Sequence, residues 1–170
     1  MIDLSGDVIY YLDIKYDTIV DGIGFRNSIY CAGCDIHCKG CHNPQSHDIN
    51  NGKAITVDKA SELLLENGNN VTFTGGECSL QARAFCNLAI ILKQHGRTIW
   101  LYSGRTFEEL THSPLTKELL SNVDVLVDGR FIEELRDTSL RFRGSSNQRL
   151  IDVKKSMQTG HIVLWGDTNE

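Results

Sequence analysis

The sequence has few prolines, no long apolar run and no excess of positive charge. Only Pro44 and Pro114 interrupt its 170 residues, so the chain lacks the proline-rich composition typical of linkers. Nowhere do about 18 apolar residues follow one another, which argues against a membrane-spanning helix. The formal net charge of −5 supplies no basic field for binding nucleic acid phosphates. With 41% hydrophobic and 23% charged residues, the composition is that of one globular domain with a sizeable core.

The N-terminus also lacks the features of a secretion signal. Residues 1–7 contain neither a basic region nor an apolar stretch. We therefore expect a cytoplasmic protein whose six cysteines serve chemistry or packing, rather than a small secreted domain held together by disulfides.

Short runs of β-branched and aromatic residues alternate with segments of helical periodicity. The runs 71–74, 98–102 and 123–127 predict strands. Three helices are expected: from Thr56 or Asp58 to Gly68, from a cap at Ser79 to Gly96, and from a capping box of Thr106 and Glu109 onward. This alternation predicts an α/β fold with a mostly parallel sheet and right-handed crossovers.

Four of the six cysteines are crowded into one short segment. It reads Cys31-Ala-Gly-Cys34-Asp-Ile-His-Cys38-Lys-Gly-Cys41, and the last three cysteines have the spacing C-x3-C-x2-C. Thiolates this close together in one loop can hold an iron–sulfur cluster. A zinc site is the alternative, because the segment also contains two C-x2-C pairs. Zinc ribbons, however, separate their pairs by about a dozen residues or more, whereas three residues lie between Cys34 and Cys38.

A second group of residues follows the predicted strand 71–74. Thr74-Gly75-Gly76-Glu77 leads from this strand into a helix, and glycines in such a turn let a ligand approach the backbone closely. The cysteine segment likewise follows an early predicted strand, residues 26–30. It therefore falls where α/β folds carry their chemistry, at the carboxyl ends of the strands.

In order and spacing, these segments resemble the radical S-adenosylmethionine (SAM) enzymes that activate glycyl radical proteins. The C-x3-C-x2-C segment is similar to their cluster-binding signature, and Gly75-Gly76-Glu77 to the turn that binds the amino group of SAM. Cys78 stands where that family usually has proline. Further similar segments, within about residues 17–153, are Asp21–Arg26, Cys41–Pro44, Leu101–Leu110, Val125–Phe131 and Arg143–Arg149. They point to the small activating enzymes of anaerobic ribonucleotide reductases.

The resemblance implies a fold, cofactors and site residues. The fold would be a partial (incomplete) TIM-like βα barrel of the radical SAM type, with residues 1–170 forming one domain. Cys34, Cys38 and Cys41 would bind a [4Fe-4S] cluster, and SAM would chelate the fourth iron. Cys31 is not expected to be a ligand, because a fourth thiolate would close that iron. The expected SAM contacts are Gly40, Cys41, His42, Gly75, Gly76, Glu77 and Ser103, and no side chain is assigned a catalytic acid–base role.

The resemblance also implies an activity and partners. The chain would be an oxidoreductase similar to the formate C-acetyltransferase-activating enzyme, cleaving SAM reductively and generating a glycyl radical. Its partner would be the large subunit of an anaerobic (class III) ribonucleotide reductase, and its electron donor an external flavodoxin- or thioredoxin-type system. No nucleic acid or membrane partner is expected. The arginine-rich stretch 130–149 is a candidate docking surface for the reductase.

Other functions share parts of this pattern. They are a small-molecule radical SAM enzyme resembling 7-carboxy-7-deazaguanine synthase, an activase of another glycyl radical enzyme, an iron–sulfur electron carrier and a zinc-stabilised binding module. The pattern assigns no role to Cys78 or Cys86, although a packing role is favoured for Cys78. The tail from Gln158 to Glu170 also has no assigned role, and its residues 161–165 are either a final strand or a partner-binding segment.

Overall fold

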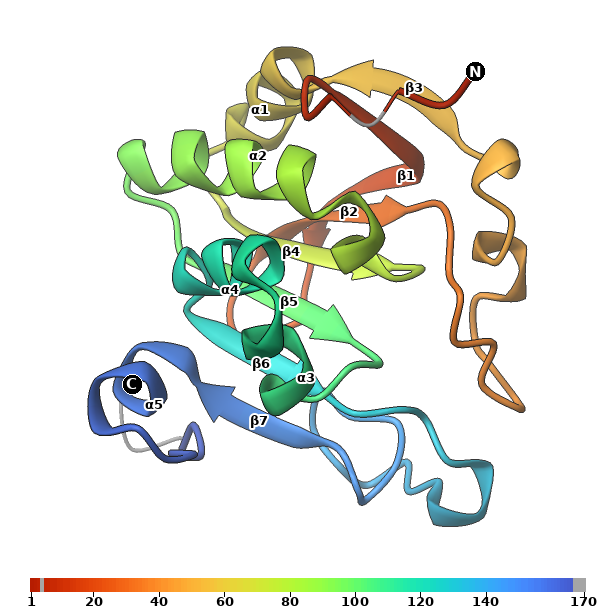
Figure 1. Ribbon diagram of the computed structural model, residues 1–170, viewed down its shortest axis with the longest axis vertical. Helices are drawn as coiled ribbons and strands as arrows, with labels where there is room; N and C mark the ends of the chain where they lie inside the picture. Colours follow the sequence, from red (N-terminus) through yellow and green to blue (C-terminus); the bar gives the residue numbers. More distant parts are fainter. Residues whose placement is uncertain (4, 167–170) are drawn as a thin grey trace.

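One mixed β-sheet organises the molecule (Figure 1). The structure is a computed structural model that describes residues 1–3 and 5–166, and within them seven strands pair in the order β3-β1-β2-β4-β5-β6-β7. The strands are β1 (Val8–Thr18), β2 (Arg26–Cys31), β3 (Lys53–Thr56), β4 (Asn70–Gly75), β5 (Ile99–Ser103), β6 (Val125–Asp128) and β7 (Arg149–Asp152). The α-helices are α1 (Val57–Leu65), α2 (Ala82–Gln94), α3 (Phe107–His112), α4 (Pro114–Ser121) and α5 (Val153–Thr159). None of the helices in these described ranges is long and apolar enough to cross a membrane.

The centre of the sheet is parallel and its edges are antiparallel. Strands β2, β4, β5 and β6 pair in parallel, each added on the same side of the one before. Because such crossovers are right-handed, this order places the connecting helices on one face of the sheet. Figure 1 shows α1, α2 and α4 along that face, and α2 contacts both of the other two. β1 with β3 extends one edge and β7 the other, all by antiparallel pairing, so the sheet stays open.

The predicted α/β class is confirmed, and the predicted strands correspond to β4, β5, β6 and, for residues 26–30, β2. The antiparallel strands β1, β3 and β7 were not predicted. The two edge strands β3 and β7 are only four residues long, which leaves little room for a recognisable alternation of apolar and polar residues.

Two of the three predicted helix starts are also confirmed. The Thr56 side chain accepts a hydrogen bond from the Lys59 backbone N–H at the start of α1, and the Thr106–Glu109 capping box opens α3. The prediction that Ser79 caps the next helix is wrong. The 3-10 turn η3 (Cys78–Gln81) precedes α2, and the Ser79 hydroxyl donates to Glu77 Oε1 at 2.7 Å instead.

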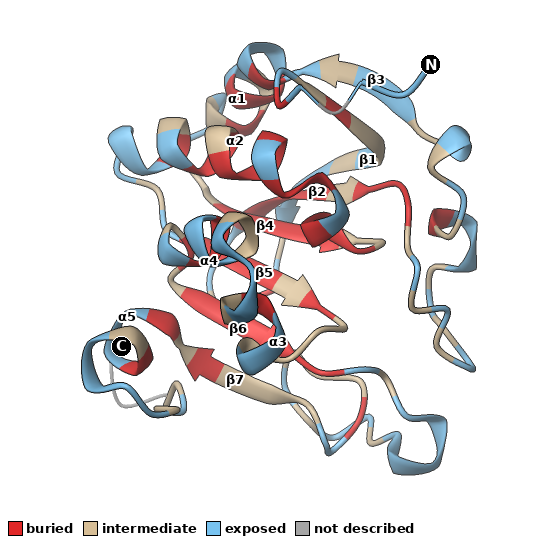
Figure 2. Cartoon of the chain, in the orientation of Figure 1, coloured by how far each residue is buried: buried red, intermediate tan, exposed pale blue. Residues whose placement is uncertain are grey.

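Apolar residues pack on both faces of the sheet. Figure 2 shows buried residues concentrated in the central strands and on the sheet-facing sides of α1 and α2. On the opposite face, Trp100 meets Phe142 and Trp165, with ring centroids 5.1 and 5.2 Å apart. The tail lies along the outer edge of β7, where Leu164 forms an isolated bridge with Ile151 and no regular strand. Residues 167–170 of the tail lie outside the described residues.

Arg26 on β2 is a fully buried cation. Its guanidinium donates to Thr72 Oγ1 and the Val71 carbonyl, both at 2.7 Å, and lies 5.5 Å from the ring centroid of Trp100. Burial lowers the pKa of Arg26 to about 10, so the side chain keeps its charge at neutral pH. The arginine of the Asp21–Arg26 segment therefore fastens the start of β2 to β4 and β5, and it stays out of the pocket described below.

Candidate functional site

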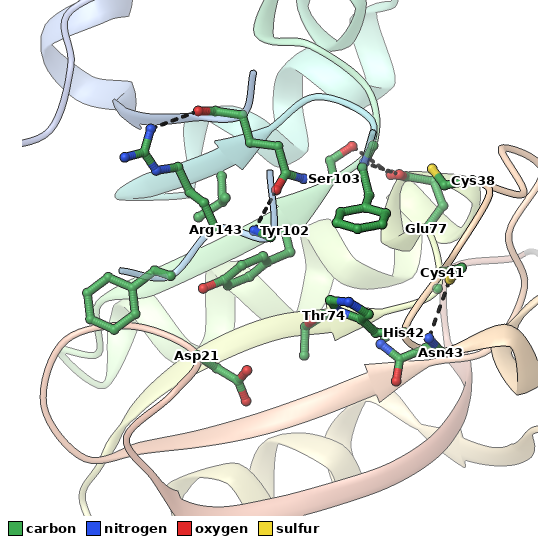
Figure 3. Close-up of a pocket in the computed structure, with 18 of the residues that line it drawn as sticks. Asp21, Cys38, Cys41, His42, Asn43, Thr74, Glu77, Tyr102, Ser103 and Arg143 are labelled. Carbon is green, nitrogen blue, oxygen red and sulfur yellow. Dashed lines mark hydrogen bonds between the residues drawn. The ribbon is translucent and has the colours of Figure 1, made fainter. Parts of the chain in front are cut away.

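A pocket of about 790 Å³ lies at the carboxyl ends of the parallel strands (Figure 3). Its volume falls in the range of roughly 300–1,000 Å³ that small-molecule sites occupy. Cys34, Cys38 and Cys41 line it, together with the Gly75–Gly76 turn after β4 and Ser103 at the end of β5. Two segments that are far apart in the sequence, the cysteine loop and the glycine turn, therefore share one pocket.

Backbone hydrogen bonds hold the base of the cysteine loop, residues 32–43. The Gly33 N–H donates to the Ser46 carbonyl at 2.7 Å, and the Cys34 N–H to the His47 carbonyl at 3.3 Å. Inside the loop, His37 and Gly40 have left-handed φ angles of 53° and 73°, which turn the chain tightly. This tight path places all three cysteines in the pocket lining without regular secondary structure.

The surroundings of these three thiols suit an iron–sulfur cluster. Each cysteine is partly exposed and lines the pocket. The Asn43 N–H donates to Cys41 Sγ at 3.4 Å. Burial raises the pKa of the Cys34 thiol, while backbone N–H groups of His37 and Ile36 act in the opposite direction by stabilising the thiolate. Hydrogen bonds to sulfur are one of the ways in which proteins tune such clusters.

The same donors are not arranged for a single metal ion. Within residues 1–3 and 5–166, no three His, Cys, Asp or Glu side chains are grouped in a way that could hold one ion. A structural zinc site needs four ligands around one centre, whereas a [4Fe-4S] cluster takes each thiolate on a different iron. A zinc site made of the two C-x2-C pairs would also need Cys31, which is buried outside the pocket lining.

Cys31 lies in the core, outside the pocket lining. It ends β2 with no exposed surface, and the equally buried Cys78 thiol donates to its Sγ at 3.1 Å. Burial raises the pKa of Cys78, so this thiol stays protonated and serves as a small packing residue. Cys86 is also buried, on α2, where Asn122 Nδ2 lies 3.8 Å from its sulfur.

The Gly75–Gly76 turn packs directly against the base of the cysteine loop. A Cβ on Gly75, which has a φ of +100°, would lie 2.6 Å from the Cys31 nitrogen, and a Cβ on Gly76 would overlap the Gly33 carbonyl oxygen. The Gly76 N–H also donates to the Cys31 carbonyl at 2.9 Å. The close backbone approach expected here is thus made first by the chain itself, and the glycines seat the cysteine loop on the sheet.

The carboxylate of Glu77 is 1% exposed and already bonded within the chain. Its Oε1 accepts from the hydroxyls of Ser79 and Ser103 at 2.7 and 2.9 Å, and its Oε2 from the Gly104 N–H at 2.9 Å. The Ser103 oxygen also accepts the Arg105 N–H at 3.0 Å. Glu77 and Ser103 line the pocket, but their polar atoms primarily tie the glycine turn to the end of β5.

Of the remaining predicted SAM contacts, one lies in the pocket and the other does not. His42 lines the pocket, and its ring lies 5.0 Å from that of Phe131. Gly40 is not part of the lining, and a Cβ there would face the Glu133 side chain at 3.1 Å.

Several lining residues were not predicted. They are Lys15, Ile19, Val20 and Asp21 from β1 and the β1–β2 connection, Tyr30, Ile36, Asn43, Thr74, Tyr102 and Gly104, and, after β5, Val127, Gly129, Phe131, Leu140–Gly144 and Gln148. The Tyr30 hydroxyl donates to the Asp21 carboxylate at 2.8 Å, and burial raises the pKa of both Tyr30 and Tyr102. Asp21 and Arg143 belong to two of the segments that resemble the family, Asp21–Arg26 and Arg143–Arg149. The resemblance therefore pointed to these segments, but it did not indicate what the two side chains do.

The polar segment after β6 is an ordered wall of the pocket. Gln148 Oε1 accepts the Gly144 N–H at 2.8 Å, and Gln148 Nε2 donates to the Gly129 carbonyl at 2.9 Å. Three arginines of the 130–149 stretch are bonded inside the chain: Arg130 to Glu109 at 3.4 Å, Arg143 to the Gln148 carbonyl at 3.0 Å and Arg149 to Asp128 at 2.6 Å. Arg143 and Arg149 therefore support this wall, whereas the Arg130 side chain pairs with α3 outside the pocket lining. All three pairings leave fewer arginines for docking.

Comparisons with known proteins show which proteins the chain is similar to. The 4Fe-4S single cluster domain family matches residues 20–151. The anaerobic ribonucleoside-triphosphate reductase-activating protein of Pasteurella multocida is 32% identical over 152 residues, which cover 81% of this chain and 94% of that protein. The proteins of the same name from Escherichia coli K12 and Enterobacteria phage T4 are each 31% identical, over 76% and 81% of this chain and 90% and 93% of their own lengths.

Proposed function

We propose that this chain, which belongs to the 4Fe-4S single cluster domain family and to the anaerobic ribonucleoside-triphosphate reductase-activating proteins, generates a glycyl radical on an anaerobic ribonucleotide reductase. The reaction would use a [4Fe-4S] cluster and SAM. One observation carries the proposal: three cysteines line the same pocket as the glycine turn, while the nearby Cys31 is withdrawn into the core. That arrangement supplies three thiolates for four irons and leaves one iron free for SAM.

When bound, the cluster would supply the electron that splits SAM into methionine and a 5′-deoxyadenosyl radical, which takes a hydrogen atom from a glycine Cα of the reductase. The residues of the chain hold the reactants. Cys34, Cys38 and Cys41 would ligate three irons, and the glycine turn would place the methionine end of SAM beside them. His42 and the pocket wall formed by Phe131 and the segment 140–148 would enclose the remainder of SAM and exclude water.

The proposal also extends to the type of fold, the cellular location and the electron donor. The open sheet, with helices on one face and the pocket at the carboxyl ends of its parallel strands, would be the incomplete βα barrel of a radical SAM domain that spans residues 1–170. Such a domain, acting on the large subunit of a class III reductase, would work in the cytoplasm with a flavodoxin- or thioredoxin-type electron donor.

The mouth of the pocket supports a protein as the second reactant. Ile19 and Val20 are adjacent aliphatic residues that line the pocket and are 65% and 69% exposed. A glycine-bearing segment of the reductase entering here would cover them. Arg136 is exposed beside this wall and stays a candidate docking residue, whereas Arg130 and Arg149 are held by Glu109 and Asp128.

The proposal predicts SAM cleavage by the isolated chain. After anaerobic reconstitution with iron and sulfide, the reduced protein is expected to convert SAM into methionine and 5′-deoxyadenosine, because one iron lacks a protein thiolate. Adding SAM is expected to change the electron paramagnetic resonance (EPR) spectrum of the reduced cluster. A cluster that is reduced but leaves SAM intact would indicate an electron carrier, and tight zinc binding without iron would indicate a structural metal site.

A further inference from the structure

Arg105 connects the cysteine loop with the buried carboxylate behind the glycine turn. Its Nη2 donates to Asp35 Oδ2 at 2.6 Å, and its Nη1 donates to Ser79 Oγ at 3.1 Å. The same Nη1 lies 3.8 Å from Glu77 Oε1. One guanidinium therefore contacts Asp35, which follows Cys34 in the cysteine loop, and Ser79, which follows the glycine turn. It also lies close to the buried Glu77 carboxylate.

Negative charge gathers around Cys34. Asp35 follows it in the loop, and Glu77 lines the same pocket as Cys34. In the described part of the chain, neither carboxylate pairs with a cation other than Arg105. Lys39, the lysine of the cysteine loop, pairs instead with Glu133 and Glu134 after β6, at 3.2 and 3.7 Å. Arg105 is thus the cation placed to balance this end of the site.

We propose that Arg105 is a positioning residue of the cluster site, which fixes the cysteine loop against the Glu77 turn and balances the negative charge beside Cys34. The inference rests on the proposed cluster ligation by Cys34, Cys38 and Cys41, and it adds a residue outside the pocket lining. Glu77 is buried, so its interaction with the guanidinium is weakly screened, whereas the half-exposed Asp35 contributes less.

The reduction potential of the cluster separates a charge effect from a loosened loop. Reduction adds an electron, so removing a nearby positive charge disfavours it and removing a nearby negative charge favours it. Arg105→Gln is expected to shift the potential to more negative values, and Asp35→Asn to less negative values. Both substitutions weaken the same Arg105–Asp35 contact, so simple loosening of the loop would shift the potential in the same direction in both variants.

Iron retention measures the positioning part of the proposal. Reconstituted Arg105→Gln is expected to lose iron to a chelator several-fold faster than the unmodified chain, because the loop loses its tie to Ser79 and Glu77. Arg105→Lys keeps the positive charge but cannot contact Asp35 and Ser79 at the same time. Its reduction potential should therefore lie close to that of the unmodified chain, while its iron loss stays faster. The matched control is Arg130→Gln, which breaks the exposed pair with Glu109 outside the pocket and should change neither property.

Potential shifts of the same sign in Arg105→Gln and Asp35→Asn, or no shift in either, would overturn the proposal. So would an effect of Arg130→Gln as large as that of Arg105→Gln. These measurements need neither SAM nor the reductase, so they can succeed or fail independently of the proposed activity. Failure of SAM cleavage by the unmodified, cluster-loaded chain would count against the proposed function alone.

Discussion

Replacing Cys34, Cys38 or Cys41 by alanine, one at a time, is expected to abolish assembly of the [4Fe-4S] cluster, whereas Cys31→Ala should retain it. Each of the first three thiols lines the pocket, and with only three ligands the loss of one leaves too few to hold the cluster. Cys31 is a core residue against Cys78, so its loss removes packing and no ligand. We expect Cys31→Ala to lower the free energy of unfolding by roughly 1–2 kcal/mol.

Iron and sulfide content after anaerobic reconstitution, together with the visible absorption spectrum, checks this prediction. Cys86→Ala is a matched control, because it removes another buried thiol from a helix outside the pocket. Equal loss of metal in all four loop variants would indicate a site closed by four thiolates, and SAM would then have no iron to bind.

Gly76→Ala is expected to destabilise the fold and prevent cluster assembly together. The new Cβ would overlap the Gly33 carbonyl oxygen, which belongs to the backbone and cannot rotate away, so the base of the cysteine loop must move. We expect a loss of about 2–3 kcal/mol in the free energy of unfolding, the upper part of the range for overpacking. Thermal unfolding of the metal-free chain measures the stability, and iron binding after reconstitution measures the site.

Gly96→Ala separates the clash from backbone strain. Gly96 has a left-handed φ of +74°, but nothing lies within 4 Å of a Cβ placed there. The Gly96→Ala substitution should therefore lower the free energy of unfolding by only about 1 kcal/mol and leave the cluster intact. A Gly76→Ala protein that is as stable as the unmodified chain and binds iron, but binds SAM weakly, would show that the glycine serves the ligand rather than the cysteine loop.

The parallel centre of the fold could be predicted because its strands are strongly apolar and its helices begin with recognisable caps. The Thr106–Glu109 capping box is a local sequence signal, and the structure confirms it at the start of α3. Ser79 carries the same kind of signal, but its hydroxyl donates to Glu77 two residues earlier, and the Glu77 carboxylate caps η3 in its place. The edge strands β3 and β7 depend on pairing with β1 and β6 more than on their own short sequences.

The site could be predicted only as far as its chemistry is local. Three cysteines in one loop indicate a cluster by themselves, and the structure brings them to the glycine turn. The structure adds the backbone contact between Gly76 and Gly33, the engagement of Glu77 and Ser103 with each other, and the position of Gly40 outside the lining. Each of these depends on how β2, β4 and β5 stand side by side. Sequence spacing alone does not encode that arrangement.

Formation of the radical on the partner tests the central claim most directly. The reduced, cluster-loaded chain is mixed anaerobically with its cognate reductase and SAM, and the EPR spectrum of the reductase is recorded. We predict a doublet split by the remaining α-hydrogen, which collapses when the reductase carries glycine deuterated at Cα, persists with Cys31→Ala and is absent with Cys38→Ala. Absence of the doublet under conditions in which the same preparation cleaves SAM would contradict the account.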